Sequence, residues 1–288
     1  MVFIIFIRCK KFDSSNFLSA HTVNFLFTSI ETYGIINRIE DVRGHTGRGG
    51  STHRLHHKES YNAMIYCEDF VETYNRLEKE TIDCIITDPP YGIQFEGNDW
   101  DSNLDFLEVF FEESHRVLKP TGTLIMFTGW SSLVEVLSKS EPFNLRNIIC
   151  YDRIKGRGAK KNFVSTREEI LFFSKSDTYT FHVLQSTIKK KTGGMGTKNG
   201  KECRTLSNVW SDISPLVPWS KERVKHPTQK PLQLMERIVD VFTNEGDTVL
   251  DPFMGSGSTG VATINRNRNF IGCEKNTEYF DIAKERMI

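Results

Sequence analysis

The segment 248–265 constrains the fold more than any other part of the sequence, because a short apolar run, a glycine-rich turn and a helical pattern follow one another directly. The turn reads DPFMGSGSTG, and its Gly255, Gly257 and Gly260 have the GxGxxG spacing. Such a turn brings the backbone close to a ligand at the N-terminus of the following helix. Glu274 closes the next apolar run, where a carboxylate is placed to bind both hydroxyls of a ribose. The segment predicts a nucleotide-like cofactor and leaves open whether it is NAD or S-adenosylmethionine.

Strand-like and helix-like patterns alternate from about residue 62 onward. The run IDCIIT at 82–87 is nearly all apolar, as expected of a parallel strand covered on both faces. Further strands are predicted at 63–67, 123–127, 147–154, 169–174, 248–250 and 270–273, and helices at 69–79, 104–118, 231–242, 258–265 and from 278 onward. This alternation predicts an α/β fold with a doubly wound, mostly parallel sheet.

A second constellation directly follows the strand predicted at 82–87. Asp88, Pro89, Pro90 and Tyr91 form a turn in which the two prolines prevent continuation of a helix or of a sheet ladder. The turn presents a carboxylate, a backbone carbonyl and an aromatic ring. The carboxylate and the carbonyl can each accept one N–H of an exocyclic amino group, while the ring stacks on a planar base. A rigid structural turn is the alternative interpretation of the tetrapeptide alone.

Charge is distributed unevenly along the sequence. The whole chain carries 37 Lys and Arg against 37 Asp and Glu, whereas residues 146–230 hold 18 basic residues against 7 acidic ones. This basic stretch predicts a surface for a polyanion such as nucleic acid. A solvated, lysine-rich insertion is the alternative, and charge alone does not choose between the two.

Residues 1–60 do not share the alternating pattern. They include a polar stretch at 44–58 with four histidines (His45, His53, His56 and His57) that have no cysteine or carboxylate at ligand spacing. We therefore expect an N-terminal extension that is poorly ordered and holds no metal. Elsewhere the six cysteines form no CxxC pair, and no apolar run approaches the roughly 18 residues of a membrane span. The expectation is a cytoplasmic protein.

Five motifs in one order connect the sequence with a known family. They are DPPY at 88–91, RVLKP at 116–120, HPTQKP at 226–231, DPFMGSGSTG at 251–260 and NTEY at 276–279. In these motifs the chain resembles the β-class DNA amino-methyltransferases, which methylate adenine N6 or cytosine N4, and it is most like the site-specific DNA-adenine methyltransferases. The resemblance implies a Rossmann-like, circularly permuted S-adenosylmethionine-dependent methyltransferase fold over 61–288. It also implies an inserted target-recognition region within 128–225.

The resemblance assigns roles to individual residues. It implies that the catalytic residues are Asp88, Pro89, Pro90 and Tyr91. It implies that S-adenosylmethionine contacts Asp69, Lys230, Asp251, Phe253, Gly255, Gly257, Thr259 and Glu274. The basic residues expected to contact DNA are Arg153, Lys155, Arg157, Lys160, Lys161 and Arg167. The nearby aromatic residues, Phe163 and Trp210, are expected in the core.

The activity implied by the resemblance is methyl transfer to N6 of an adenine flipped out of double-stranded DNA. An Asp opening the tetrapeptide favours adenine, and N4 of cytosine is the alternative within the same fold. A homodimer and a cognate restriction endonuclease are further partners that the family suggests. A nicotinamide-dependent dehydrogenase would use the same glycine-rich turn and Glu274, but it leaves DPPY, HPTQKP and the basic stretch unexplained.

Overall fold

The computed structural model describes residues 33–38, 61–93, 103–157, 161, 163–186 and 204–288. The strands are β1 (Tyr33–Arg38), β2 (Tyr61–Tyr66), β3 (Ile82–Thr87), β4 (Leu118–Thr128), β5 (Asn144–Arg157), β6 (Ser165–Ser174), β7 (Gln185–Ser186), β8 (Arg204–Thr205), β9 (Val209–Trp210), β10 (Thr248–Asp251) and β11 (Asn269–Cys273). The helices are α1 (Phe70–Arg76), α2 (Leu107–Val117), α3 (Leu133–Ser138), α4 (Leu232–Phe242), α5 (Ser258–Asn265) and α6 (Thr277–Met287). Strands and helices thus alternate through most of the described chain, as predicted.

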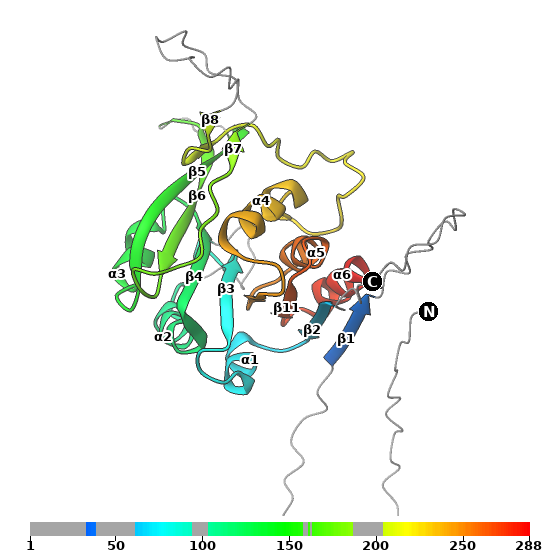
Figure 1. Ribbon diagram of the computed structural model, residues 1–288. Coiled ribbons are helices and arrows are strands. Elements are labelled where there is room, and N and C mark those ends of the chain that lie inside the picture. Colours follow the sequence, from blue (N-terminus) through cyan, green and yellow to red (C-terminus); the bar gives the residue numbers. More distant parts are fainter. Residues whose placement is uncertain (1–32, 39–60, 94–102, 158–160, 162, 187–203) are drawn as a thin grey trace, which may run out of the picture.

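The centre of the main sheet is parallel. The sheet has nine strands in the order β1-β2-β11-β10-β3-β4-β6-β5-β9 (Figure 1). Strands β2, β11, β10, β3 and β4 all run in one direction, whereas β6 pairs antiparallel with both β4 and β5. β10 and β11 therefore lie between β2 and β3, which are consecutive in the sequence. This arrangement confirms the predicted α/β, mostly parallel sheet.

Both faces of the central sheet are buried. Successive side chains of a strand point to opposite sides, so two neighbouring residues of β3 show what covers each face. On one face, Ile85 of β3 packs in a cluster with Phe70 of α1 and Phe110 of α2. On the other face, Ile86 packs in a cluster with Leu234 of α4. All of these side chains are buried. The helices of the two faces thus cover a doubly wound sheet.

One part of the N-terminal extension belongs to the sheet. Residues Tyr33–Arg38 form β1, which pairs antiparallel with β2 along its whole length, from Tyr33 opposite Tyr66 to Arg38 opposite Tyr61. Backbone hydrogen bonds to the edge of β2 hold these six residues, while poor order of the extension stays a prediction. Residues 1–32 and 39–60, including the four histidines, lie outside the described residues.

The element boundaries were predicted with mixed success. β3 and α5 have the predicted bounds, whereas β4 begins at Leu118 instead of residue 123. Its register against β3 shifts between Leu118 and Thr123, and this bulge accommodates Pro120, which has no N–H for the ladder. In α2, Val109 is 44% exposed, whereas Phe110 and Val117 of the same helix are buried.

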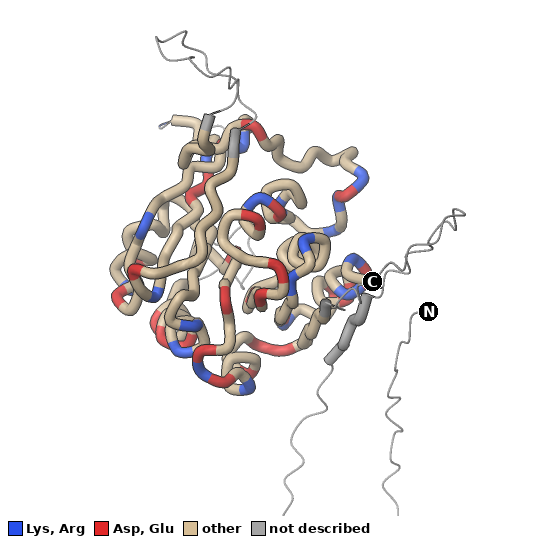
Figure 2. Tube along the Cα trace, in the orientation of Figure 1, with Lys and Arg blue, Asp and Glu red and all other residues tan. Residues whose placement is uncertain are grey.

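Acidic and basic residues are unevenly distributed over the described chain, although ion pairs such as Arg76–Glu68 and Lys119–Asp83 join the two kinds around α1 and β3. Acidic residues gather around α1 and the start of β3 (Figure 2): they are Glu68, Asp69, Glu72, Glu78, Glu80 and Asp83. The described part of the basic stretch at 146–230 forms β5 to β9 and the segment that leads to α4. Within the described residues, no helix is long and apolar enough to cross a membrane.

Candidate active site

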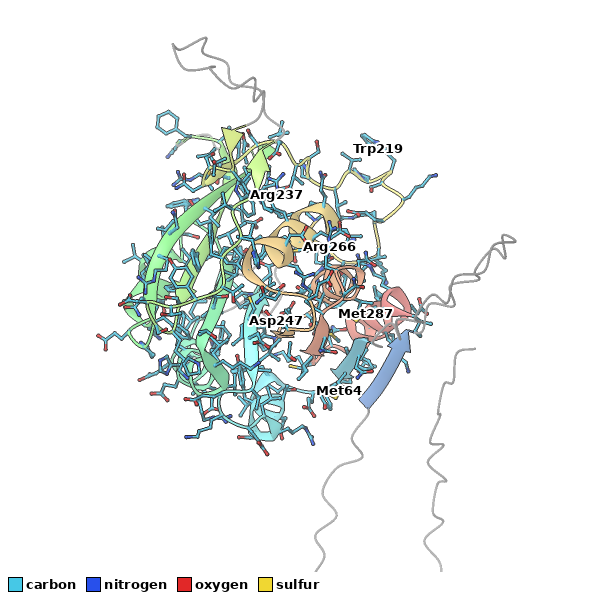
Figure 3. All side chains as sticks on the ribbon, in the orientation of Figure 1. Met64, Trp219, Arg237, Asp247, Arg266 and Met287 are labelled. Atoms are coloured by element: carbon cyan, nitrogen blue, oxygen red, sulfur yellow. The ribbon has the colours of Figure 1, made fainter. Side chains whose placement is uncertain are left out.

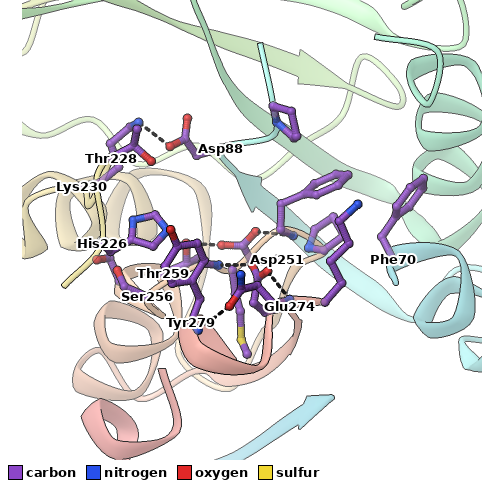
Figure 4. Close-up of a pocket in the computed structure, with 18 of the residues that line it drawn as sticks. Phe70, Asp88, His226, Thr228, Lys230, Asp251, Ser256, Thr259, Glu274 and Tyr279 are labelled. Carbon is purple, nitrogen blue, oxygen red and sulfur yellow. Dashed lines mark hydrogen bonds and ion pairs between the residues drawn. The ribbon is translucent and has the colours of Figure 1, made fainter. Parts of the chain in front are cut away.

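A cavity of about 560 Å³ opens at the carboxyl ends of the parallel strands. It is lined by four carboxylates: Asp69 after β2, Asp88 after β3, Asp251 at the end of β10 and Glu274 after β11. Figure 4 shows Asp88, Asp251 and Glu274. In open α/β sheets, this edge is where ligands bind. Because β10 and β3 are neighbours, the glycine-rich turn and the DPPY turn face the same cavity although they are far apart in the sequence.

Asp251 joins these two turns. Its Oδ1 atom accepts hydrogen bonds from the Thr87 hydroxyl at 2.8 Å and from the Phe253 N–H at 3.1 Å, and its Oδ2 atom accepts one from the Thr259 hydroxyl at 2.5 Å. Asp251 is 2% exposed. Burial raises its pKa to about 7, while the three hydrogen bonds act in the opposite direction. Asp251 thereby ties the end of β3 to the first turn of α5.

We expect the substitution Asp251→Asn to change how stability depends on pH. The Asp251 pKa of about 7 in the folded protein lies above the usual value, so the folded state binds more protons between the two pKa values. Relative to the variant, the wild-type protein should lose free energy of unfolding as pH rises from about 4 to about 7, by up to about 1.4 kcal/mol per pH unit. Urea unfolding of both proteins across this range measures the difference.

Comparing the wild-type protein with Asp251→Asn also removes the effect of His226 on the pH dependence of stability. Burial lowers the pKa of His226 to about 4, with Lys230 and two nearby arginines adding to the shift, so His226 acts on stability in the opposite direction. This contribution is common to both proteins and cancels. A difference in unfolding free energy that stays constant with pH would contradict the raised Asp251 pKa.

Glu274, which follows β11, also holds the glycine-rich turn. Its Oε2 atom accepts a hydrogen bond from the Gly255 N–H at 3.0 Å, and its Oε1 atom accepts one from the Asn276 N–H at 2.8 Å. Gly255 has φ +50°, and a Cβ there would lie 2.9 Å from Nε2 of His226. A side chain at Gly255 would therefore collide with the His226 ring that lines the cavity.

Asp88 is hydrogen-bonded through both carboxylate oxygens. Its Oδ2 atom lies 2.5 Å from Lys230 Nζ, a pair that Figure 4 shows above His226, and its Oδ1 atom accepts a hydrogen bond from the Tyr91 hydroxyl at 2.6 Å. Lys230 is only 8% exposed and also lies 3.4 Å from Oε1 of Glu168. Burial lowers the Lys230 pKa, but the carboxylates of Asp88 and Glu168 outweigh burial and raise it. Lys230 is therefore a buried cation shared by two carboxylates.

The family to which the chain belongs follows from comparison with known proteins. The sequence profile of the DNA methylase family (N6_N4_Mtase) matches residues 82–285. The chain belongs to the DNA methylase family. It is 35% identical over 233 residues to the Type II methyltransferase M.HpaI of Haemophilus parainfluenzae (77% of this chain, 73% of that protein). It is 34% identical over 239 residues to the DNA adenine methyltransferase YhdJ of Escherichia coli strain K12 (76% and 80%).

Solved structures of DNA methylases share the fold. The complex of M1.HpyAVI with S-adenosylmethionine is 29% identical to this chain, with a TM-score of 0.55 over 78% of this chain and 99% of that one. The cytosine-N4-specific PvuII DNA methyltransferase has a TM-score of 0.61 over 78% and 86%, at 19% identity, which shows the fold alone. These findings confirm the predicted family and its Rossmann-like fold. The protein is a DNA methyltransferase whose cofactor is S-adenosylmethionine.

The cavity of this DNA methylase fits such a cofactor. Asp69 and Glu274 present carboxylates from the ends of neighbouring strands, and these can accept hydrogen bonds from hydroxyl and amino groups. The Phe70 and Phe253 rings, 5.0 Å apart, form an apolar wall for a planar base. Nδ1 of His226 is buried and has no hydrogen-bond partner among the described residues. Acceptors, an aromatic wall and an unsatisfied polar atom together suit a nucleoside bearing an amino acid.

Most of the residues predicted for the cofactor line this cavity. They are Asp69, Lys230, Asp251, Phe253, Gly255, Thr259 and Glu274. Gly257 does not line it and instead faces α6, where a Cβ would lie 2.6 Å from Cε of Met287. Figure 3 labels Met287, near the end of α6. Of the predicted catalytic residues, Asp88 and Pro90 line the cavity. Pro89 is buried, and the Tyr91 hydroxyl donates hydrogen bonds to Asp88 and Glu168.

The residues predicted to contact DNA are described only in part. Arg153 lines a second cavity of about 300 Å³, which adjoins the first because Thr228 and Lys230 line both. Lys161 is exposed, and the exposed Arg167 forms an ion pair with Glu169 at 2.8 Å. Lys155 and Arg157 lie in β5 with side chains outside the described part, and Lys160 is not among the described residues. Among the members of this set whose side chains are described, Arg153 lines one of the two cavities, and Lys161 and Arg167 line neither.

Two aromatic residues of this region differ from each other. Trp210 is buried, as predicted, with its ring N–H donating to the carbonyl of Ser207 at 2.7 Å. Phe163 is 93% exposed, so the prediction that it belongs to the core was wrong. Trp219 is also largely exposed, on the segment that leads to α4 (Figure 3). In the sequence, Phe163 thus lies between Arg153 and Glu168, which both line the second cavity. Trp219 likewise follows Pro218, which also lines it.

Sequence reasoning missed Glu168. This residue is 7% exposed, and its Oε1 atom accepts a hydrogen bond from the Tyr91 hydroxyl at 3.2 Å in addition to its contact with Lys230. The available signal was a pair of glutamates, at 168 and 169, directly before the apolar run ILFF at 170–173. A charge in such a position requires a buried partner, and the sequence did not reveal that Lys230 is that partner.

Proposed function

We propose that this protein transfers a methyl group from S-adenosylmethionine to the exocyclic N6 of adenine in double-stranded DNA. The observation that carries the proposal is the position of Asp88 at the cavity wall, with its orientation fixed by Lys230 and the Tyr91 hydroxyl. The tetrapeptide opens with Asp, and the similar YhdJ is named a DNA adenine methyltransferase. Both features favour adenine over cytosine.

The proposed mechanism uses hydrogen-bond acceptors to prepare the target nitrogen. The Asp88 carboxylate and the Pro89 carbonyl each accept one N–H of the amino group, which draws the nitrogen lone pair out of conjugation with the ring. The Tyr91 ring contacts the face of the flipped base, and this contact offsets part of the few kcal/mol that flipping costs. Alignment of the reacting groups then provides most of the rate enhancement.

The residues of the larger cavity hold the methyl donor in this proposal. When bound, S-adenosylmethionine supplies an electrophilic methyl group on a sulfonium sulfur. Glu274 and Asp69 bind its polar groups, while Phe70 and Phe253 exclude water from one side. Asp251, whose oxygens already accept three hydrogen bonds, acts by positioning the glycine-rich turn.

Methyl transfer from labelled S-adenosylmethionine to unmethylated genomic DNA tests this proposal, with nucleoside analysis of the product. N6-methyladenine is the expected product. N4-methylcytosine would overturn the base assignment and leave the mechanism in place, because both bases present an exocyclic amino group. No label in DNA from a protein that binds S-adenosylmethionine would refute the proposed substrate.

The remaining regions have proposed roles around this site. Residues 61–288 would form the catalytic domain, and 128–225 would contain the target-recognition region. Arg153 and the other basic residues named above would neutralise phosphates, so DNA affinity should fall steeply with salt. A cytoplasmic location, a homodimer and a cognate restriction endonuclease are proposed on the similarity to M.HpaI, which is named a Type II methyltransferase.

A further inference from the structure

Asp88 and Glu168 share two hydrogen-bond donors. Lys230 Nζ lies 2.5 Å from Oδ2 of Asp88 and 3.4 Å from Oε1 of Glu168. The Tyr91 hydroxyl lies 2.6 Å from Oδ1 of Asp88 and 3.2 Å from the same Oε1 atom of Glu168. Both donors are therefore closer to Asp88, and one oxygen of Glu168 is within reach of both.

This arrangement restricts the task assigned to Asp88. The proposed function requires an Asp88 oxygen to accept an N–H from the target base, and both oxygens already accept hydrogen bonds of 2.5 and 2.6 Å that fix the orientation of the carboxylate. Turning the carboxylate toward the base therefore weakens at least one of these two bonds. Neither Lys230 nor the Tyr91 hydroxyl can give up its need for an acceptor by losing its proton. Burial, Asp88 and Glu168 raise the Tyr91 pKa well above its usual value, and the same two carboxylates keep the Lys230 pKa raised. Each donor needs another buried acceptor when Asp88 turns to the base.

We propose that Glu168 is a positioning residue that accepts Lys230 and the Tyr91 hydroxyl when Asp88 binds the target amino group. This inference rests on the proposed function. Glu168 lies on β6, where its backbone is opposite Tyr151 of β5, so its position is fixed by the sheet. Both donors are already within 3.4 Å of its Oε1 atom, and only small side-chain movements complete the exchange.

Glu168 is suited to this exchange by its charge as well as its position. It is buried, and it lines the second cavity together with Lys230. A charged acceptor binds an ammonium more strongly than a neutral amide does, so Lys230 can move from one carboxylate to the other without losing its counter-ion. A glutamine at this position keeps an oxygen acceptor and the side-chain shape but removes the charge.

The test compares Glu168→Gln with wild-type protein in methyl transfer to DNA. We expect kcat to fall roughly 10- to 100-fold, while the Kd for S-adenosylmethionine changes less than about twofold. The control is Asp212→Asn, which neutralises another largely buried carboxylate, paired with Arg237 of α4 at 2.7 Å, outside both cavities. The control should lose stability and keep kcat per folded molecule. An unchanged kcat in Glu168→Gln would refute the inference.

A double variant separates exchange from mere structural support. Lys230→Met removes the shared cation, so Glu168 then accepts from the Tyr91 hydroxyl alone. In this background, Glu168→Gln should lower kcat less than about threefold, or raise it because one of two buried carboxylates that have lost their counter-ion is removed. If Glu168→Gln lowers kcat by the same factor with and without Lys230→Met, the inference is overturned. The proposed function is then still upheld by DNA methylation in the wild-type protein. No methylation by wild-type protein would overturn both.

Discussion

The substitution Asp88→Ala should abolish methyl transfer while leaving S-adenosylmethionine bound. Loss of the carboxylate removes one of the two acceptors proposed for the target amino group, and we expect the rate to fall by about 10³-fold or more. The fold should survive, because Lys230 keeps a counter-ion in Glu168 at 3.4 Å. Single-turnover methyl transfer to DNA and equilibrium binding of S-adenosylmethionine measure the two effects separately.

Asp83→Ala is the matched control for this experiment. Asp83 lies on β3, the strand that Asp88 follows, and is also paired with a lysine, Lys119, at 2.7 Å, but it lies outside the cavity. It also accepts a hydrogen bond from the Thr248 N–H at 2.9 Å, so its loss should lower stability. Methyl transfer per folded molecule should be retained. Full activity in Asp88→Ala would refute the proposed mechanism.

The substitution Gly257→Ala should destabilise the protein strongly. Gly257 precedes α5 with φ +76°, a conformation that costs an L-residue about 1–2 kcal/mol. A Cβ there would lie 2.9 Å from Cβ of Ala283 and closer still to Met287, and such overpacking costs a further ~1–3 kcal/mol. The sum should lower Tm by roughly 5–15 °C, measured by thermal unfolding.

Gly246→Ala isolates the backbone part of this effect. Gly246 has φ +83°, and no atom lies within 4 Å of a Cβ built there. This variant should therefore lose only the ~1–2 kcal/mol of conformational strain. Equal losses in the two variants would contradict the packing of Gly257 on α6. A large loss of S-adenosylmethionine affinity in folded Gly257→Ala would instead favour the cofactor contact that the motif predicted.

The sequence predicted those parts of the fold that depend on local patterns. β3 is a short apolar run ended by two prolines, and α5 follows a glycine turn, so both could be bounded from the residues alone. β1 could not be predicted, because its six residues are held by pairing with β2 and not by a pattern of their own. The order of β11 and β10 between β2 and β3 is likewise set by tertiary contacts.

The candidate site was predictable to the same extent. Asp88, Asp251 and Glu274 each follow or end an apolar strand, and polar residues in that position meet at one edge of a parallel sheet. Glu168 was missed because it lies inside a buried strand, and its partner Lys230 is 62 residues away. For Gly257, the motif correctly indicated a tight turn, but only the packing of α6 shows which neighbour the glycine meets.

The insertion of β10 and β11 between β2 and β3 has a consequence for biosynthesis. β2 and β3 leave the ribosome early, yet each has a parallel neighbour that is translated after all the other strands. The Thr87–Asp251 hydrogen bond spans 164 residues, and such non-local closure slows folding. Until β10 and β11 have been translated and have joined the sheet, the facing edges of β2 and β3 leave backbone N–H and C=O groups unpaired. Such edges are open to association with other nascent chains. We expect this methylase to complete its central sheet only after release, with chaperones limiting aggregation beforehand.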